Sequence, residues 1–148
     1  MSAVREVISV REKFAELYEE YMPKIYRYIQ YRVNNVQLAE DLTSTTFEKA
    51  LVNFDKYCSD KASFSTWLFS IARNIVIDHY RVAGRRQMVP LEEAKQVLTG
   101  DLSPEEEVVR REEMAMLHSC LAGLPRADQE IISLKFGAEL TNRQIAKM

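Results

Sequence analysis

The residues best suited to recognition chemistry lie in the stretch FSTWLFSIARNIVIDHYR (Phe64–Arg81). Its apolar residues recur at steps of three and four and predict one amphipathic helix. The inner side consists of Phe64, Trp67, Leu68, Ile71, Ala72, Ile75 and Val76. The other side should be polar, but it combines aromatic and apolar groups with basic ones, namely Thr66, Phe69, Arg73, Ile77, Tyr80 and Arg81. This mixture indicates a binding surface, unless Phe69 and Tyr80 pack against the linker and Arg73 pairs with a carboxylate on a neighbouring helix.

Charge is distributed unevenly along the chain. The formal net charge is -2, but residues 61–86 hold five basic residues and one acidic residue, whereas residues 87–122 hold three and eight. A local basic patch is the electrostatic signature of phosphate binding. A solvated helix end with cations near its C-terminus would give the same composition. Charge alone therefore leaves both interpretations open.

A second polar surface is predicted on a helix that runs from about Val36 to Phe54. Its apolar arc consists of Ala39, Leu42, Thr46, Phe47, Ala50 and Phe54. Its opposite side presents a stripe at steps of three and four, made of Asp41, Ser44, Thr45 and Glu48. Plain exposure to solvent is the simplest interpretation of this stripe.

The sequence argues against catalysis, metal binding and membrane insertion. It has no Gly-rich phosphate loop and no His–carboxylate cluster, and His79 and His118 are far apart in the chain. Cys58 and Cys120 form no CxxC pair, which favours two reduced thiols in a cytoplasmic chain. No apolar run approaches the ~20 residues that a membrane span needs. We therefore expect a protein that is not an enzyme and has no cofactor and no metal.

All elements in the first half of the chain are predicted to be helical. Helical spacing of apolar residues starts at Phe14, and Pro23 should kink that helix or start a new one. VNN (Val33–Asn35) predicts a break, with Asn34 or Asn35 as the cap of the next helix. Three helices joined by short loops make a helical bundle over residues 1–83. Residues 84–104 contain Gly and Pro and show weak periodicity, which predicts a linker.

Residues 105–148 predict a further helical domain. Ser103 and Glu106 form a capping box for a helix that ends near Leu121. Its inward residues are expected to be Val109, Met116, Leu117 and Leu121. A second helix should end at Gly137 as its C-cap, and Thr141 with Gln144 starts a third.

A short helix, a turn and a capped helix are the beginning of a helix-turn-helix motif. Only seven residues follow Thr141, so the second helix of the motif is incomplete. We expect residues 141–148 to be frayed, with Ile145 and Met148 exposed.

Three phrases in chain order resemble bacterial RNA polymerase sigma factors of the extracytoplasmic-function (ECF) group, within the sigma-seventy superfamily. AEDLTSTTFEKAL (Ala39–Leu51) is similar to that group's helix for binding core polymerase. FSTWLFSIARNIVIDHYR is similar to its helix for DNA melting and minus-ten recognition. LPRADQEIISLKFGAELTNRQIAKM (Leu124–Met148) is similar to the opening of its minus-thirty-five recognition domain. The resemblance covers residues 12–86 and 105–148.

The resemblance implies an all-α fold in two parts. Residues 1–83 would be the region-two helical bundle, which binds core polymerase and the minus-ten element. Residues 84–104 would be the linker, and residues 105–148 a partial region-four domain that lacks its recognition helix.

The resemblance also implies that the helix from Phe64 and the loop before it hold single-stranded non-template promoter DNA. Such a strand offers base faces for stacking and phosphates for neutralisation, which suits interleaved aromatic and cationic side chains. An unstacked base needs a small pocket with hydrogen-bonding groups, and we expect one where the loop Tyr57–Ser63 meets Phe64. The residues expected to bind DNA are Lys61, Ser63, Phe64, Arg73, Asn74, Arg81, Arg85 and Arg86. Asn74 and Asp78, one turn apart, could instead bond each other.

For the polar stripe, the resemblance implies contact with the clamp helices of core RNA polymerase. The residues of this face are Asp41, Leu42, Ser44, Thr45, Phe47 and Glu48. A basic partner surface would complement Asp41 and Glu48. Family members commonly have Gln and Glu where this chain has Ser44 and Thr45, so we expect a weaker contact at the same place. An anti-sigma protein is a further partner that the resemblance allows.

Two functions compete. The favoured one is a sigma factor that directs promoter recognition, DNA melting and transcription initiation. The alternative is a polymerase-binding decoy, or a degenerate copy, that does not select promoters. The basic and aromatic helix side favours DNA contact, whereas the missing recognition helix favours the decoy.

Overall fold

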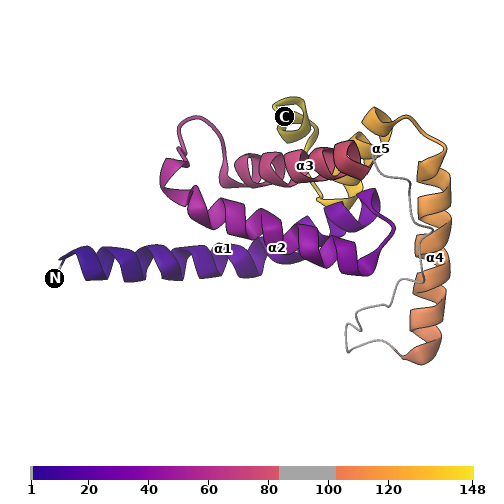
Figure 1. Ribbon diagram of the computed structural model, residues 1–148, viewed down its shortest axis with the longest axis horizontal. Helices are drawn as coiled ribbons and strands as arrows, with labels where there is room; N and C mark the ends of the chain where they lie inside the picture. The colour runs from indigo at the N-terminus through magenta and orange to yellow at the C-terminus, as the bar shows by residue number, and fades with distance from the viewer. Residues whose placement is uncertain (1, 84–102) are drawn as a thin grey trace.

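The computed structural model describes residues 2–83 and 103–148, and these ranges contain helices and turns but no strand (Figure 1). The α-helices are α1 (Ser2–Arg32), α2 (Val36–Val52), α3 (Phe64–Ala83), α4 (Pro104–Ala122), α5 (Arg126–Ile132) and α6 (Asn142–Ala146). A 3-10 turn, η1 (Phe54–Lys56), follows α2, and a π-helical turn, η2 (Ser133–Gly137), follows α5. The predicted all-α fold is confirmed.

Helix α1 is one continuous helix of 31 residues, and Pro23 lies inside it. The helix therefore starts earlier than its apolar spacing predicted, and Pro23 does not begin a new one. The half that joins the bundle buries Ile25, Tyr28 and Ile29. The first turns extend beyond the other helices, and the apolar side chains there are exposed (Figure 1).

Helices α1, α2 and α3 form the bundle that the sequence predicted. Asn35 caps α2, because its side-chain oxygen accepts a hydrogen bond from the backbone N–H of Leu38 at 3.0 Å. Small residues on the inner faces, Ala39 and Ala50 of α2 and Ala72 of α3, are fully buried and let the helices approach closely.

The C-terminal segment shares the core of this bundle. Leu134, Ala138 and Leu140 belong to the same buried cluster as Ile25 and Phe69. Ile145 and Met148 are half-buried against that cluster, so the expectation that they would be exposed is wrong. Thr141 and Gln144 form both bonds of the predicted capping box, which starts α6. The domain boundaries at residues 83 and 105 stay a prediction.

Helix α4 stands at the end of the bundle, across its long axis (Figure 1). The capping box of Ser103 and Glu106 is present as predicted. Of the four residues expected to face inward, Leu121 is buried, but Val109 and Met116 are exposed. His118 makes a polar contact between the helices instead, with its Nε2 2.5 Å from the carbonyl oxygen of Gln30 in α1.

Gly137 has a different role from the helix cap that was predicted. None of the glycines in the described ranges has a positive φ, whereas Glu139 has a φ of 57° and makes the reversal before α6. Gly137 lies directly against α1, where a Cβ atom would be 3.2 Å from Cα of Tyr28 and 3.3 Å from Cδ2 of Tyr31. Close approach of η2 to α1, rather than backbone conformation, therefore favours glycine at this position.

We expect Gly137→Ala to lower the free energy of unfolding by about 1–3 kcal/mol, because the added methyl group forces η2 away from α1. Denaturant unfolding followed by circular dichroism measures this loss. The control is Gly123→Ala, where a Cβ atom would lie at an ordinary 3.7 Å from the Cys120 carbonyl oxygen. Equal stability of the two variants would show that η2 does not need its close contact with α1.

Candidate functional site

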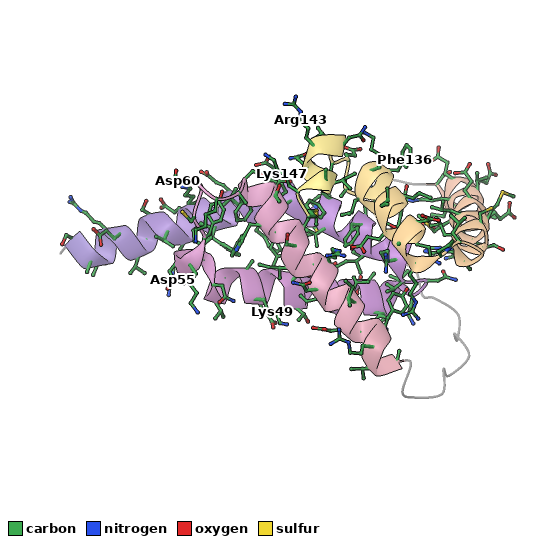
Figure 2. All side chains as sticks on the ribbon, turned by 90° about the horizontal axis from the view of Figure 1, so that it is seen from above. Lys49, Asp55, Asp60, Phe136, Arg143 and Lys147 are labelled. Atoms are coloured by element: carbon green, nitrogen blue, oxygen red, sulfur yellow. The ribbon has the colours of Figure 1, made fainter. Side chains whose placement is uncertain are left out.

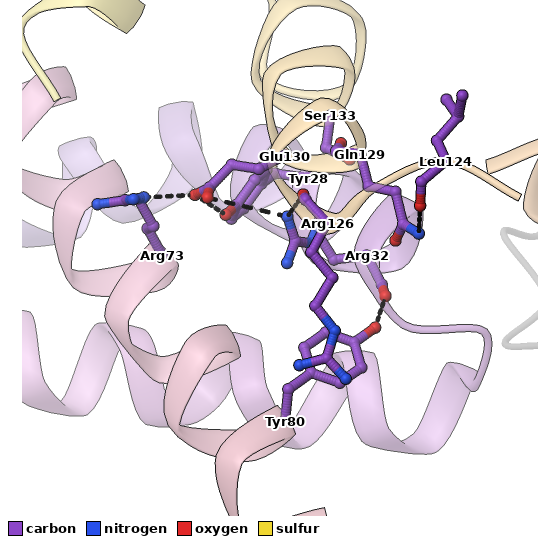
Figure 3. Close-up of polar contacts among 9 residues, drawn as sticks. All are labelled: Tyr28, Arg32, Arg73, Tyr80, Leu124, Arg126, Gln129, Glu130 and Ser133. Carbon is purple, nitrogen blue, oxygen red and sulfur yellow. Dashed lines mark hydrogen bonds and ion pairs between the residues drawn. The ribbon is translucent and has the colours of Figure 1, made fainter. Parts of the chain in front are cut away.

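Polar side chains from α1, α3 and α5 converge on one carboxylate, that of Glu130 (Figure 3). The Nε of Arg73 donates a hydrogen bond to Glu130 at 2.6 Å, and the hydroxyl of Tyr28 donates one at 3.3 Å. A guanidinium nitrogen of Arg32 lies 4.0 Å from the same carboxylate. We call the set Tyr28, Arg32, Arg73, Tyr80, Arg126 and Glu130 the Glu130 cluster.

Helical spacing explains how these residues meet. Arg126 and Glu130 are four residues apart and lie on one side of α5, and Arg73 and Tyr80 are seven apart and share a side of α3. These two sides face each other. The guanidinium carbon of Arg126 lies 4.7 Å from the ring centroid of Tyr80, and the carboxylate of Glu130 pairs with Arg73. Helix α5 therefore contacts α3 at two points, which are two turns apart on α3.

Helix α1 contributes the third side of the cluster. Arg32 donates a hydrogen bond from Nη1 to the backbone oxygen of Arg126 at 3.3 Å. The Tyr80 hydroxyl donates to the backbone oxygen of Arg32, which ties the end of α3 to the end of α1 (Figure 3). The Glu130 cluster thus links the bundle to the C-terminal segment mainly through polar contacts.

The cluster has three cations and one carboxylate, so it carries excess positive charge. The Arg32 side chain is only 3% exposed and that of Glu130 12%, whereas that of Arg73 is 37% exposed. Burial raises the pKa of the Tyr28 hydroxyl, and the nearby negative charge of Glu130 raises that pKa further. Burial also raises the pKa of Tyr80, so both hydroxyls keep the proton that they donate.

The outward side of α3 differs from the one that the sequence predicted. Phe69 is fully buried, and its ring meets the edge of the Tyr28 ring at a centroid distance of 5.9 Å. Thr66 is buried and Tyr80 half-buried. The aromatic part of the predicted face is therefore wrong, because α1 and the C-terminal segment cover more of α3 than its main apolar stripe indicated.

Two predicted DNA-binding residues on α3, Asn74 and Arg81, are exposed. They lie seven residues apart on one side of the helix, with the exposed Asp78 between them. Arg81 lies 3.9 Å from Asp78, and both side chains are more than half exposed, so this ion pair is weak. Arg73 lies one residue earlier, beside this line, and is held by Glu130.

The loop before α3 combines half-exposed aromatic rings with an exposed cation. Phe64 is half-buried, and its ring centroid is 5.6 Å from those of Tyr57 and Trp67. The Tyr57 hydroxyl donates to the carbonyl oxygen of Ala62 at 3.0 Å, which holds the loop in place. Lys61 is exposed at the tip of the loop. The aromatic and basic mixture predicted for the side of α3 is therefore found at its start.

Ser63 has a structural task at the start of α3. Its hydroxyl oxygen accepts a hydrogen bond from the backbone N–H of Thr66 at 3.2 Å, as a helix cap does. A hydroxyl contact with a base would therefore compete with this cap. The other two residues expected to bind DNA, Arg85 and Arg86, lie outside the described residues.

The polar stripe predicted on α2 is present at the surface, and its role in binding polymerase stays a prediction. Asp41, Ser44 and Glu48 are exposed, and Leu42 and Thr45 are half-buried. Phe47 is 5% exposed, and its ring centroid lies 4.7 Å from that of Tyr18, so it supports the stripe from inside.

The sequence did not predict two exposed apolar neighbours of this stripe. Leu51 and Val52 are 51% and 76% exposed and continue the stripe toward the end of α2. Their position three and four residues after Glu48, one helical turn along the same side, could have indicated that they continue the stripe.

The ranges that the structure describes contain neither a candidate metal site nor a candidate membrane span. No group of three or more His, Cys, Asp or Glu side chains there could hold a metal ion. No helix in those ranges is long and apolar enough to cross a membrane. Cys58 and Cys120 are both exposed and not paired with each other.

Comparison with known proteins agrees with this geometry. The family model for Sigma-70 region 2 matches residues 17–86, which hold most of the bundle, including α2, α3 and the loop between them. The ECF RNA polymerase sigma factor BldN of Streptomyces coelicolor is 34% identical over 137 residues, which cover 93% of this chain and 52% of BldN. The chain thus spans about half the length of that relative.

Two further relatives are matched over most of their own length. The ECF RNA polymerase sigma factor SigW of Bacillus subtilis is 30% identical over 93% of this chain and 78% of SigW. The ECF RNA polymerase sigma factor RpoE of Cereibacter sphaeroides is 33% identical over 90% of this chain and 72% of RpoE. With this breadth of similarity and an all-helical bundle under the region 2 match, the chain belongs to the ECF group of the sigma-70 family.

Proposed function

We propose that this protein is a sigma factor that binds core RNA polymerase through α2 and holds single-stranded minus-ten DNA along α3. The observation that supports this most directly is a line that runs from the exposed Lys61 in the loop to Asn74 and Arg81, which are exposed on one side of α3, while the turns of α3 between the loop and Asn74 are buried or half-buried. The line has a cation at each end and a half-exposed aromatic group, Phe64 with Tyr57 and Trp67, near its start.

Each part of this line has a chemical role. Arg81 would pair with a phosphate, which positions the strand without reading its sequence. Asn74 presents an amide that can both donate and accept hydrogen bonds at a base edge. The aromatic rings beside the loop would stack on an unpaired base, as aromatic side chains do on single strands. None of these roles involves catalysis or a cofactor.

The stripe on α2 would dock on the clamp helices of the polymerase. Asp41 and Glu48 supply negative charge for a basic partner, and Leu51 and Val52 add exposed apolar area at one end. Binding of polymerase would place the protein in the cytoplasm, where its two free thiols stay reduced. Recognition of the minus-thirty-five element and an anti-sigma partner remain proposals that rest on the family resemblance.

A polymerase-binding decoy is the second candidate, and one observation favours it. Glu130 already occupies Arg73, the cation nearest the middle of the proposed DNA path. A chain in which Arg73 stays paired with Glu130 would bind polymerase through α2 but would have one cation fewer on α3 for promoter DNA.

Two substitutions on α3 should have separable effects on DNA binding. We expect Arg81→Ala to weaken binding to every sequence and to reduce the salt slope by about one unit or less, because it removes one phosphate contact. Asn74→Ala should relax base preference and leave the salt slope unchanged. The measurement is the affinity of the polymerase complex for a pre-melted promoter fork at several salt concentrations, with matched and altered minus-ten sequences.

A uniform result would contradict the proposed DNA path. If Arg81→Ala and Asn74→Ala both leave fork affinity, base preference and salt dependence unchanged, the exposed line on α3 is only a solvated helix side. The decoy would then be the better account.

Charge reversal on α2 tests the polymerase contact. We expect Asp41→Arg to weaken binding to core polymerase by about 2 kcal/mol, because it places like charges at the interface. Asp41 is suited to this test because its side chain is exposed. Its carboxylate accepts a hydrogen bond at 3.1 Å from Gln37 of the same helix. The control is Glu112→Arg, an equal charge change on the exposed side of α4. Equal affinity of both variants, with unchanged circular dichroism, would place the contact elsewhere.

A further inference from the structure

We propose that the cavity between the end of the bundle and helices α4 and α5 binds a small organic phosphate monoester, whose phosphate lies at Arg126 and Arg32. This inference goes beyond the proposed function, because none of the described residues proposed to contact polymerase or DNA lines this cavity.

The cavity is large and open to solvent, with a volume of about 950 Å³. Its wall comes from the end of α1 and the turn after it, the end of α3, the C-terminal half of α4 and the start of α5, which meet at one end of the bundle (Figure 1). Ligand pockets typically have volumes of about 300–1,000 Å³. An inorganic ion would leave most of this space to water, so a molecule with a larger body fits it better.

Two arginines in the wall give the cavity an excess of positive charge. The guanidinium carbon of Arg126 lies 4.7 Å from the ring centroid of Tyr80, and that of Arg32 lies 5.7 Å from the same centroid (Figure 3). The carboxylate of Glu130 is 2.6 Å from Arg73 but 4.0 Å from Arg32. No carboxylate is among the described residues that line the cavity. The charge of the two wall arginines is therefore incompletely neutralised.

Both arginines also keep unused hydrogen-bond donors. Arg126 is exposed and makes no ion pair within residues 2–83 and 103–148, and its stacking on Tyr80 orients the guanidinium while its N–H groups stay available. The Nε of Arg32 is buried and has no hydrogen-bond partner in the described part of the chain. An unpaired donor that is buried is unfavourable. An oriented guanidinium beside a second cation suits bidentate recognition of a phosphate.

Charge favours a phosphate monoester over a carboxylate as the anionic group. A phosphate monoester carries a charge of about -1.5 to -2 at pH 7 and offers three acceptor oxygens. A carboxylate carries one negative charge and offers two oxygens. Arg32 and Arg126 together carry two positive charges, so the monoester neutralises the pair and the carboxylate does not.

The rest of the wall suits an aromatic or heterocyclic body. Val33, Leu38 and Leu121 supply apolar surface, and the imidazole of His79 and the amide of Asn34 supply polar groups. A nucleoside has an apolar ring face and a polar ring edge, so it matches both kinds of surface. A nucleoside monophosphate is therefore the probe that combines the required charge with the required body.

Binding to the free, full chain is measured by isothermal titration calorimetry with adenosine 5′-monophosphate. We expect saturable binding with one site per chain, and a higher midpoint of thermal unfolding, because the ligand binds the folded state alone. Inorganic phosphate lacks the body and adenosine lacks the charge, so each should bind at least about tenfold more weakly. The guanosine, cytidine and uridine monophosphates are titrated in the same way.

Arg126→Ala tests the cation that is accessible. We expect it to weaken binding of the nucleotide at least about tenfold, because it removes charge-assisted hydrogen bonds to the phosphate. The control is Arg143→Ala. Arg143 is exposed on α6 and points away from the bundle (Figure 2), so its removal should leave the affinity unchanged.

Ala122→Trp tests the space without removing a charge. Ala122 lines the cavity, so an indole at this position should take up part of the volume and weaken binding of the nucleotide. The control is the same substitution at Ala127, which is exposed on α5 and is not one of the described residues of the wall. If Arg126→Ala does not fold by circular dichroism, the two tryptophan variants still decide the position of the site.

Three results would overturn the proposal. One is the absence of saturable binding for all four nucleoside monophosphates at millimolar concentration. Another is inorganic phosphate or adenosine binding as tightly as adenosine 5′-monophosphate, because the cavity would then recognise only an ion or only an apolar body. The third is unchanged nucleotide affinity in the folded Arg126→Ala and Ala122→Trp variants, which would place the nucleotide elsewhere on the chain.

Discussion

One buried charge helps to hold α5 in place, beside the apolar core that Leu134 enters directly after it. The guanidinium of Arg32 lies at the end of α1 with almost no exposure, and a charge so placed requires a partner of opposite sign. Glu130 is the carboxylate within reach, and because Arg73 donates to it as well, the requirement of Arg32 also fixes α5 against α3. The turn η2 continues directly from α5 and adds its own contacts to α1, through the buried Leu134 and the close approach at Gly137.

This arrangement gives α3 two roles with conflicting demands. Its packing side must be apolar and well filled, and the fully buried Leu68, Phe69 and Ala72 meet that demand. Its recognition side must offer accessible polar groups to a partner, and Asn74 and Arg81 do so. Arg73 stands at the border between the two sides. Its side chain is 37% exposed, although its Nε donates to the carboxylate of Glu130.

Much of the fold could be predicted from local signals. Helical spacing indicated the bundle, and both capping boxes formed because each depends on residues only three apart. Contacts between distant segments could not be predicted in this way. The burial of Phe69, the exposure of Val109 and Met116 and the identity of the carboxylate that pairs with Arg73 all depend on where α4 and α5 lie against the bundle. The sequence shows which residues of a helix face are apolar, but it does not show how many other helices pack against that face. For the site, residue type and spacing were sufficient to choose α2 and α3, whereas the partner that holds Arg73 comes from 57 residues away.

The reversal at Glu139 has a consequence for how this segment tolerates sequence change. A residue other than glycine with a φ of 57° is conformationally unfavourable by about 1 kcal/mol. The glycine that would suit this backbone stands two positions earlier, where close contact with α1 favours it. The usual pattern is therefore inverted here: position 137 is constrained by the close approach of α1, whereas position 139 is the one whose backbone conformation would favour Asn or Gly. A family alignment read only for turn signals would place the reversal two residues too early.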